Sequence, residues 1–150
     1  MTDIEYMNLA LKEAQKAFDL DEVPVGCVIV KDGIVIAKGH NLKEKEHLAT
    51  SHAEINAIKA ASKKIGDWRL NECTMYVTLE PCLMCCGALI QARIKKVIFG
   101  AYDPKGGGVV SLTHTFDIQF LNHIVQWESG LMETECLQLL KEYFKTKREK

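Results

Sequence analysis

Apolar residues recur at helical spacing near both ends of the chain. The N-terminal set predicts a helix over about residues 4–19, with Asp3 as its N-cap, and comprises Met7, Ala10, Leu11, Ala14 and Phe18. The C-terminal set predicts a helix over about residues 133–147 and comprises Met132, Cys136, Leu139, Leu140 and Tyr143. Each set covers one face only, so we expect both helices to bury that face in a core.

Short apolar runs between these helices are typical of buried strands. Residues 25–30 and 34–37 form two such runs, and the Asp32-Gly33 pair between them indicates an antiparallel hairpin. Further strands are expected at residues 74–78, 97–99 and about 124–127. Because strands and helices alternate after the initial hairpin, the pattern predicts an α/β sandwich around a mixed sheet.

Two more helices are expected in the middle of the chain. Thr50 and Ser51 are favourable N-cap residues for a helix that ends near Gly66, and Pro81 suits the first position of another helix. Polar residues 41–49 and glycine-rich residues 104–108 predict loops. No repeat or linker is visible, so we interpret residues 1–150 as a single domain.

The overall composition excludes some classes of protein. Hydrophobic residues make up 47% of the chain and charged residues 26%, which are ordinary values for a globular protein. The apolar runs are too short to span a bilayer and the acidic start lacks the layout of a signal peptide, so we expect a cytoplasmic protein without membrane contact. The formal net charge of −1 does not by itself indicate a nucleic-acid-binding domain.

Two short motifs together indicate a catalytic zinc site. His52, Cys82 and Cys85 are ligands of the kind that zinc prefers, and three protein ligands leave a fourth position for water. Glu54 follows His52 by two residues, and such residues point about 200° apart in a regular helix, so they converge only if His52 lies at an irregular first turn. Glu54 is then placed to move the proton of the water rather than to bind the metal.

A structural zinc or a redox pair is the alternative interpretation of the cysteines. A closed structural site needs a fourth protein ligand, and Cys86 lies about 100° around the helix from Cys85, where it is poorly aimed. A redox pair would need no His-x-Glu partner, so the combined motif is more specific than Cys-x-x-Cys alone. Of the other cysteines, Cys27, Cys73 and Cys136 lie in apolar patterns and are expected to be buried free thiols.

The combined motif is part of a longer set of residues that carries a family resemblance. That set comprises Val23-Pro24-Val25-Gly26, Asn41, His52-Ala53-Glu54, Thr78 to Ala88, Arg93-Ile94, Val97 to Gly100, Asp103 and Ser111-Leu112. Over about residues 5–145 the chain resembles the bacterial tRNA-specific adenosine deaminases. The resemblance implies a cytidine deaminase-like fold, a three-layer α/β/α sandwich around a five-stranded mixed sheet. It also implies hydrolysis of the wobble adenosine of a tRNA anticodon, chiefly that of arginine tRNA, to inosine and ammonia.

The resemblance assigns roles to the motif residues by position. His52, Cys82 and Cys85 would hold one Zn²⁺ per subunit, and Glu54 would carry protons between a zinc-activated water, the ring nitrogen and the leaving amine. The family works as a homodimer whose anticodon pocket takes residues from both subunits. We therefore expect a homodimeric enzyme whose substrate is a tRNA anticodon stem-loop.

The resemblance also implies contacts to RNA outside the metal site. Asn41 would hydrogen-bond the flipped adenine, since an amide can face both a ring acceptor and an amino donor. Asp103 would accept from the 2′-OH of a neighbouring nucleotide. Val23 and Leu79 correspond to residues that line the base pocket, and Lys105 to a residue near the RNA backbone.

The chain departs from the family pattern at two positions, and two other functions stay open. Val110 stands where a glycine is common, and Cys86 where a small residue such as alanine is common. The near-neutral charge favours a zinc-dependent deaminase of a free nucleobase or nucleoside such as guanine or cytosine. A non-catalytic RNA-binding subunit is a further alternative, although a purely structural zinc would not need Glu54.

Overall fold

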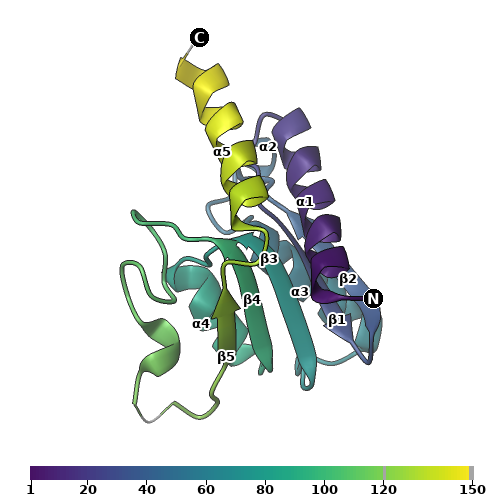
Figure 1. Ribbon diagram of the computed structural model, residues 1–150. Coiled ribbons are helices and arrows are strands. Elements are labelled where there is room, and N and C mark those ends of the chain that lie inside the picture. The colour runs from purple at the N-terminus through teal and green to yellow at the C-terminus, as the bar shows by residue number, and fades with distance from the viewer. Residues whose placement is uncertain (120, 149–150) are drawn as a thin grey trace.

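The computed structural model describes residues 1–119 and 121–148 and contains a mixed sheet between two helical layers (Figure 1). The strands are β1 (Gly26–Lys31), β2 (Ile34–His40), β3 (Cys73–Leu79), β4 (Lys96–Ala101) and β5 (Gln126–Ser129). They lie in the order β2-β1-β3-β4-β5; β1 is antiparallel to both of its neighbours, and β3, β4 and β5 are parallel to one another. The predicted five-stranded mixed sheet is thus confirmed, although β5 begins two residues later than the sequence pattern indicated.

Helices cover both faces of this sheet. The longer helices are α1 (Asp3–Asp19), α3 (Ala53–Ile65), α4 (Leu83–Gln91) and α5 (Glu133–Arg148), and the shorter elements are α2 (Lys43–Glu46) and a 3-10 turn at Thr115–Asp117. Residues of α1 and α5 share one buried cluster, and residues of α3 and α4 share the other. The arrangement is the expected three-layer α/β/α sandwich (Figure 1).

Successive side chains of β1 pack against the two helical layers in turn. Cys27 and Ile29 point into the cluster with α3 and α4, while Val28 and Val30 point into the cluster with α1. Successive side chains of a strand face opposite sides of the sheet, so a strand that is apolar at every position must be covered twice. The continuous apolar run near residue 25 is the sequence signal for this central position.

Three expected helix starts were wrong by one or two residues. The side chain of Thr2, rather than that of Asp3, accepts a hydrogen bond from the backbone N–H of Glu5 and caps α1. His52, rather than Thr50 or Ser51, is the N-cap residue of α3, and Cys82 is the N-cap residue of α4, which therefore starts after the position expected from Pro81. The side chains of His52 and Cys82 make no capping hydrogen bond. The preference of helix starts for capping residues therefore does not explain these two positions, and we attribute their residue types to a functional site.

The expected loop at residues 41–49 contains the short helix α2, which is held by a distant carboxylate. Glu22 is buried and accepts hydrogen bonds from the backbone N–H groups of Glu44 and Lys45, at 3.0 and 2.8 Å. These are donors of the first turn of α2, which otherwise need a local cap. A partner more than twenty residues away in the sequence leaves no local signal.

Gly39 of β2 allows α3 to approach the sheet closely. A Cβ atom at this position would lie 2.3 Å from the carbonyl oxygen of Ala53 and 2.7 Å from the backbone nitrogen of Ala57. Both neighbours are backbone atoms of α3, so the helix itself would have to move. The site residues at the start of α3 therefore depend on the absence of a side chain at Gly39.

Replacing Gly39 by alanine should lower the free energy of unfolding by about 1–3 kcal/mol, the usual cost of overpacking a core. Urea unfolding followed by circular dichroism measures this change. Gly87→Ala is a matched control, because nothing lies within 4 Å of a Cβ atom at this helical glycine. We expect the control to be neutral or slightly stabilising, and equal unfolding curves for the Gly39 variant and the unmodified protein would contradict the close-approach argument.

None of the helices in the described part of the chain is both long enough and apolar enough to cross a membrane.

Candidate active site

His52, Cys82 and Cys85 converge at the point where two helices begin. His52 precedes the first residue of α3, Cys82 precedes the first residue of α4, and Cys85 lies in the opening turn of α4. The Nδ1 atom of His52 lies 3.6 Å from the Sγ atom of Cys82 and 3.5 Å from that of Cys85. His52 has the extended backbone of an N-cap, which is the irregular first turn that the motif required.

The spacing of these three atoms fits a tetrahedral zinc ion. Zn–S bonds of about 2.3 Å and a Zn–N bond of about 2.0–2.1 Å at a tetrahedral angle place nitrogen and sulfur about 3.6 Å apart. The observed separations match that value, and the three ligand atoms all lie within 4.8 Å of one another. Among the described residues, this is the group of histidine, cysteine and acidic side chains that is close enough to hold a metal ion.

The protonation of the ligands is set by their contacts with one another. The hydrogen bond from Cys85, together with that from His52, lowers the pKa of Cys82 to about 4 in spite of burial. The hydrogen bond with Cys82 raises the pKa of Cys85, and the hydrogen bond with Cys82 also raises the pKa of His52. A thiolate is the form that binds metal, so Cys82 is already in that form at neutral pH, and Cys85 would lose its proton on binding.

Glu54 lies beside the ligands without belonging to their group. Its side chain comes from the first turn of α3 and is only 3% exposed, and burial raises its pKa to about 7. Cys86 also lies outside the ligand group, because its thiol points to the carbonyl oxygen of Pro81 at 3.6 Å. The structure therefore brings together the three candidate ligands and one adjacent carboxylate that the motif singled out.

A cavity of about 190 Å³ opens over these residues. It is lined by Val23, Val25, Asn41, Lys43, His52, Glu54, Leu79, Glu80, Cys82 and Asp103. A larger cavity of about 690 Å³ shares Val23, Leu79 and Asp103 with it and adds Lys105 and the end of α5 with Phe144, Lys147 and Arg148. Every residue that the sequence nominated for base or RNA contact thus lines one cavity or both.

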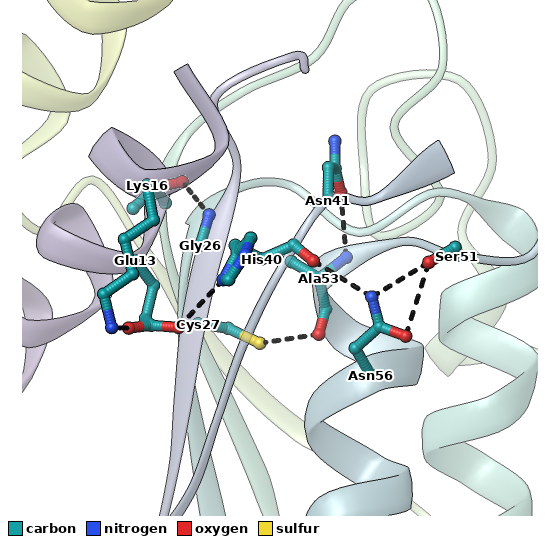
Figure 2. A network of polar contacts seen from close by, with 10 residues as sticks. Glu13, Lys16, Gly26, Cys27, His40, Asn41, Ser51, Ala53 and Asn56 are labelled. Atoms are coloured by element: carbon teal, nitrogen blue, oxygen red, sulfur yellow. Dashed lines mark hydrogen bonds and ion pairs between the residues drawn. The ribbon is translucent and has the colours of Figure 1, made fainter. Parts of the chain in front are cut away.

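The amide of Asn41 is already engaged within the protein. Its Oδ1 atom accepts a hydrogen bond from the backbone N–H of Ala53 at 2.8 Å, and its Nδ2 atom donates to the carbonyl oxygen of Val23 at 3.1 Å. Figure 2 shows the first of these bonds, together with the bond of 3.0 Å from Asn56 Nδ2 to the carbonyl oxygen of His40. Asn41 and Asn56 therefore fix the start of α3 against the end of β2.

The buried carboxylate of Glu13 joins α1 to the end of β2. The carboxylate of Glu13, in α1, is 4% exposed and lies 3.0 Å from Nδ1 of His40 and 2.6 Å from Nζ of Lys16 (Figure 2). Burial opposes the charge, but the hydrogen bonds from Lys16 and His40 outweigh it and hold the pKa of Glu13 below its ordinary value. This network does not line the cavity over the ligands.

Glu13→Gln should lower the free energy of unfolding at pH 7 by about 1–3 kcal/mol. A neutral amide replaces the buried carboxylate, so the hydrogen bonds to Lys16 and His40 lose the negative charge of their acceptor. A carboxylate with a lowered folded pKa adds stability above its unfolded pKa of about 4.3, and that stability is lost as pH falls through the folded value. The two unfolding free energies should therefore converge in acid. Urea titrations at neutral pH and near pH 3 test this, with the exposed pair Glu72–Lys95 as a control whose Glu72→Gln change should have little effect.

Three residues that line the smaller cavity, Val25, Lys43 and Glu80, were given no role from the sequence. Lys43 belongs to α2, which the polar composition of residues 41–49 had suggested to be a loop. Glu80 was quoted as part of the cysteine motif but received no role. Its signal was a lone acidic residue directly after the apolar run of β3, where a buried charge needs specific partners.

Comparisons with known proteins agree with this geometry. A sequence profile described as MafB19-like deaminase matches residues 1–148. The chain is 46% identical to a tRNA-specific adenosine deaminase of Bacillus subtilis, covering 97% of this chain and 90% of that protein, and 49% identical to one of Aquifex aeolicus, covering 95% and 94%. A structure from a study of A-to-I editing by tRNA:A34 deaminases superposes with a TM-score of 0.87 at 44% identity, covering 90% of this chain and 98% of that chain.

Proposed function

The chain belongs to the family of MafB19-like deaminases and tRNA-specific adenosine deaminases, and from this membership we propose that it converts the wobble adenosine of a tRNA anticodon to inosine. The reaction is a hydrolysis that replaces the exocyclic amine of adenine by oxygen and releases ammonia. The observation that carries the proposal is the convergence of His52, Cys82 and Cys85 beside the buried Glu54, under a cavity.

We propose zinc as the metal of this site, with one ion per chain. One imidazole and two thiolates form a donor set that zinc favours, and the separations of 3.5 and 3.6 Å fit its tetrahedral geometry. When bound, zinc would supply a water molecule of lowered pKa and polarise the reacting centre. The starts of α3 and α4 hold the three candidate ligands at these separations.

Glu54 is the proposed proton carrier of the reaction. It lines the cavity and lies outside the group of candidate ligands, so its carboxylate would be within reach of both an attacking water and a base bound there. It would take the first proton of the water and give it to the ring nitrogen of adenine, and then take the second proton from the added hydroxyl group and give it to the amine, which would leave as ammonia when the C–N bond breaks. Its burial keeps bulk water from competing for these protons.

The two adjoining cavities support an RNA substrate over a free base. Val23, Leu79 and Asp103 lie at their junction, so a base in the smaller cavity leaves the larger one for neighbouring nucleotides. The larger cavity offers the aromatic ring of Phe144 and the cations of Lys105 and Arg148, which suit bases and phosphates. We propose that Asp103 contacts a 2′-OH there and that Lys105 lies near the backbone.

For Asn41 we propose a contact with the adenine in addition to its structural bonds. Its side chain lines the smaller cavity, and its Nδ2 group makes one of the two donations available to an amide. The second donor of Nδ2 can face a ring acceptor of the base. Because Oδ1 holds Ala53, substitution of Asn41 would disturb both the base and the start of α3.

Inosine formation in an anticodon stem-loop of arginine tRNA, with adenosine at the wobble position, tests this function. Free adenosine, guanine and cytosine are assayed beside it. We expect inosine in the stem-loop alone. Turnover of a free base or nucleoside only would establish the small-molecule alternative, and RNA binding without any turnover would establish a non-catalytic subunit.

We further propose that the protein is a homodimer that acts on tRNA in the cytoplasm. The proposal rests on the family and on exposed apolar residues near the site, among them Leu83 and Leu112, which are 60% and 63% exposed. Size-exclusion chromatography with light scattering should give twice 16.9 kDa. A stable monomer that retains full activity would contradict this prediction.

A further inference from the structure

Glu80 is a buried carboxylate whose oxygens both accept hydrogen bonds from residues 103–111. The residue follows β3, is 2% exposed and precedes the candidate ligand Cys82 by two positions. One oxygen, Oε2, accepts from the backbone N–H groups of Val109, Val110 and Ser111 at 2.9–3.0 Å. The other, Oε1, accepts from the backbone N–H of Asp103 at 3.1 Å and from the hydroxyl of Ser111.

The loop at residues 103–111 is packed directly on Glu80 and on the segment that follows it. A Cβ atom at Gly107 would lie 2.3 Å from the carboxyl carbon of Glu80, so only glycine fits there. Gly107 also forms a β-bridge with Cys82, and the N–H of Gly108 donates to the carbonyl oxygen of Pro81 at 2.7 Å. The loop is therefore joined to the segment of residues 80–82 both by the carboxylate of Glu80 and by the backbone of Pro81 and Cys82.

Asp103 lies at the start of this loop and between the two cavities. Its backbone N–H is held by Glu80, while its carboxylate oxygen Oδ1 accepts from the backbone N–H groups of Lys105 and Gly106, both at 3.2 Å. Asp103 lines both cavities, and Lys105 lines the larger one. A shift of the Asp103 backbone would move both side chains relative to the ligands.

We infer that Glu80 is a positioning residue that fixes Asp103 at the junction of the cavities and thereby sets how the nucleotide beside the reacting base is held. The inference rests on the proposed RNA substrate for its functional consequence, although the anchoring itself does not. Glu80 lines the smaller cavity, but both of its carboxylate oxygens are occupied by donors of residues 103–111, so it acts through the loop. Five donors on one carboxylate are far more than is needed to bury a single charge.

The Glu80→Gln change distinguishes the hydrogen bonds made by Oε2 from those made by Oε1. Its single amide oxygen can replace Oε2, which serves three N–H groups, and its NH₂ group then takes the place of Oε1. The hydroxyl of Ser111 can rotate to accept from that group, but the backbone N–H of Asp103 cannot. Glu80→Gln therefore leaves one donor unsatisfied, at Asp103, and keeps the rest of the loop in place.

The test measures amide exchange and kinetics in the full-length, zinc-loaded protein. In Glu80→Gln, NMR should show the amide of Asp103 exchanging at least about tenfold faster than in the unmodified protein, while those of Val109 and Val110 change little. KM for the stem-loop should rise about tenfold with kcat within about twofold, the cost of one lost charged hydrogen bond. Zinc content should stay at one ion per chain.

A double-mutant cycle distinguishes positioning from general destabilisation. If Glu80 acts through Asp103, the Asp103→Ala change should raise KM much less in the Glu80→Gln background than in the unmodified protein. Glu13→Gln is the matched control, because it alters a buried carboxylate that lies outside both cavities, and it should leave KM and the exchange of Asp103 unchanged.

The outcomes separate this inference from the proposed function. The role of Glu80 would be overturned by unchanged amide exchange at Asp103 in Glu80→Gln. It would also be overturned if Asp103→Ala raised KM by the same factor in the Glu80→Gln background as in the unmodified protein. If the unmodified protein forms no inosine, the RNA function fails, and the exchange of Asp103 still decides whether Glu80 anchors the loop. Should Glu80→Gln not fold, Glu80→Asp withdraws the carboxylate from its donors by the length of one methylene group, and unchanged exchange of Asp103 in that variant would count against the anchor.

Discussion

Glu54→Gln should lower kcat for inosine formation by about 10²- to 10⁴-fold, which is the range that a positioned acid–base group contributes. Glutamine keeps the shape of glutamate and can donate hydrogen bonds, but it cannot accept a proton from water or pass one to a base. Because Glu54 is not a ligand, zinc content and affinity for the stem-loop should change little. The loss should therefore appear in kcat rather than in KM.

Single-turnover assays with excess protein measure this loss without interference from product release. Zinc is quantified on the same samples by atomic absorption, and binding is followed with a fluorescent stem-loop. Glu13→Gln serves as a control for the removal of a buried carboxylate outside the cavity, and it should keep its activity. Activity of Glu54→Gln within a factor of ten of the unmodified protein would refute the role given to Glu54.

Cys82→Ser should remove the metal and, with it, at least about a hundredfold of the activity. Loss of an outer contact to a metal ligand already costs about 10- to 100-fold in affinity or activity, and loss of a ligand costs more. The variant should also unfold at a lower temperature than the zinc-loaded protein, because an ion that binds only the folded state stabilises it. A chelator should lower the unfolding temperature of the unmodified protein and leave that of the variant unchanged.

Cys86→Ala provides the matched control for this experiment. Cys86 is next to a ligand in sequence and fully buried, but its thiol points to a backbone carbonyl group rather than to His52. The control should keep one zinc per chain and its activity. A Cys86 variant that loses zinc as Cys82→Ser does would show that the ligand set has been misassigned.

The sheet, and the grouping of the three candidate metal ligands, could be predicted because their signals are local. The hairpin follows from an Asp-Gly pair at Asp32 and Gly33, where the φ angles are +52° and +75° and ordinary residues are strained. β1 follows from its uninterrupted apolar run, since a strand buried on both faces has no polar alternation. The ligands follow from residue types whose spacing places their atoms at two helix starts.

The remaining parts of the site depend on contacts between distant segments. The bonds of Asn41 to Ala53 and Val23, and those of Glu22 to α2, join backbone groups that no local pattern marks as partners. The same holds for Glu80 and residues 103–111. A carboxylate that is surrounded by apolar neighbours in the sequence signals that partners must exist, but it does not identify them.

The three candidate ligands lie within one continuous stretch, residues 52–85, which runs through α3, β3 and the start of α4. Asp103 and the loop that Glu80 holds come later in the chain. Because the ribosome releases the chain from its N-terminus, all ligands emerge before the loop that forms the cavity wall. The bonds that join Glu80 to this loop span 23–31 positions of the sequence, so they form only after the chain has closed a loop of that length, and the cavity wall is expected to be completed later in folding than the local hairpin at Asp32 and Gly33.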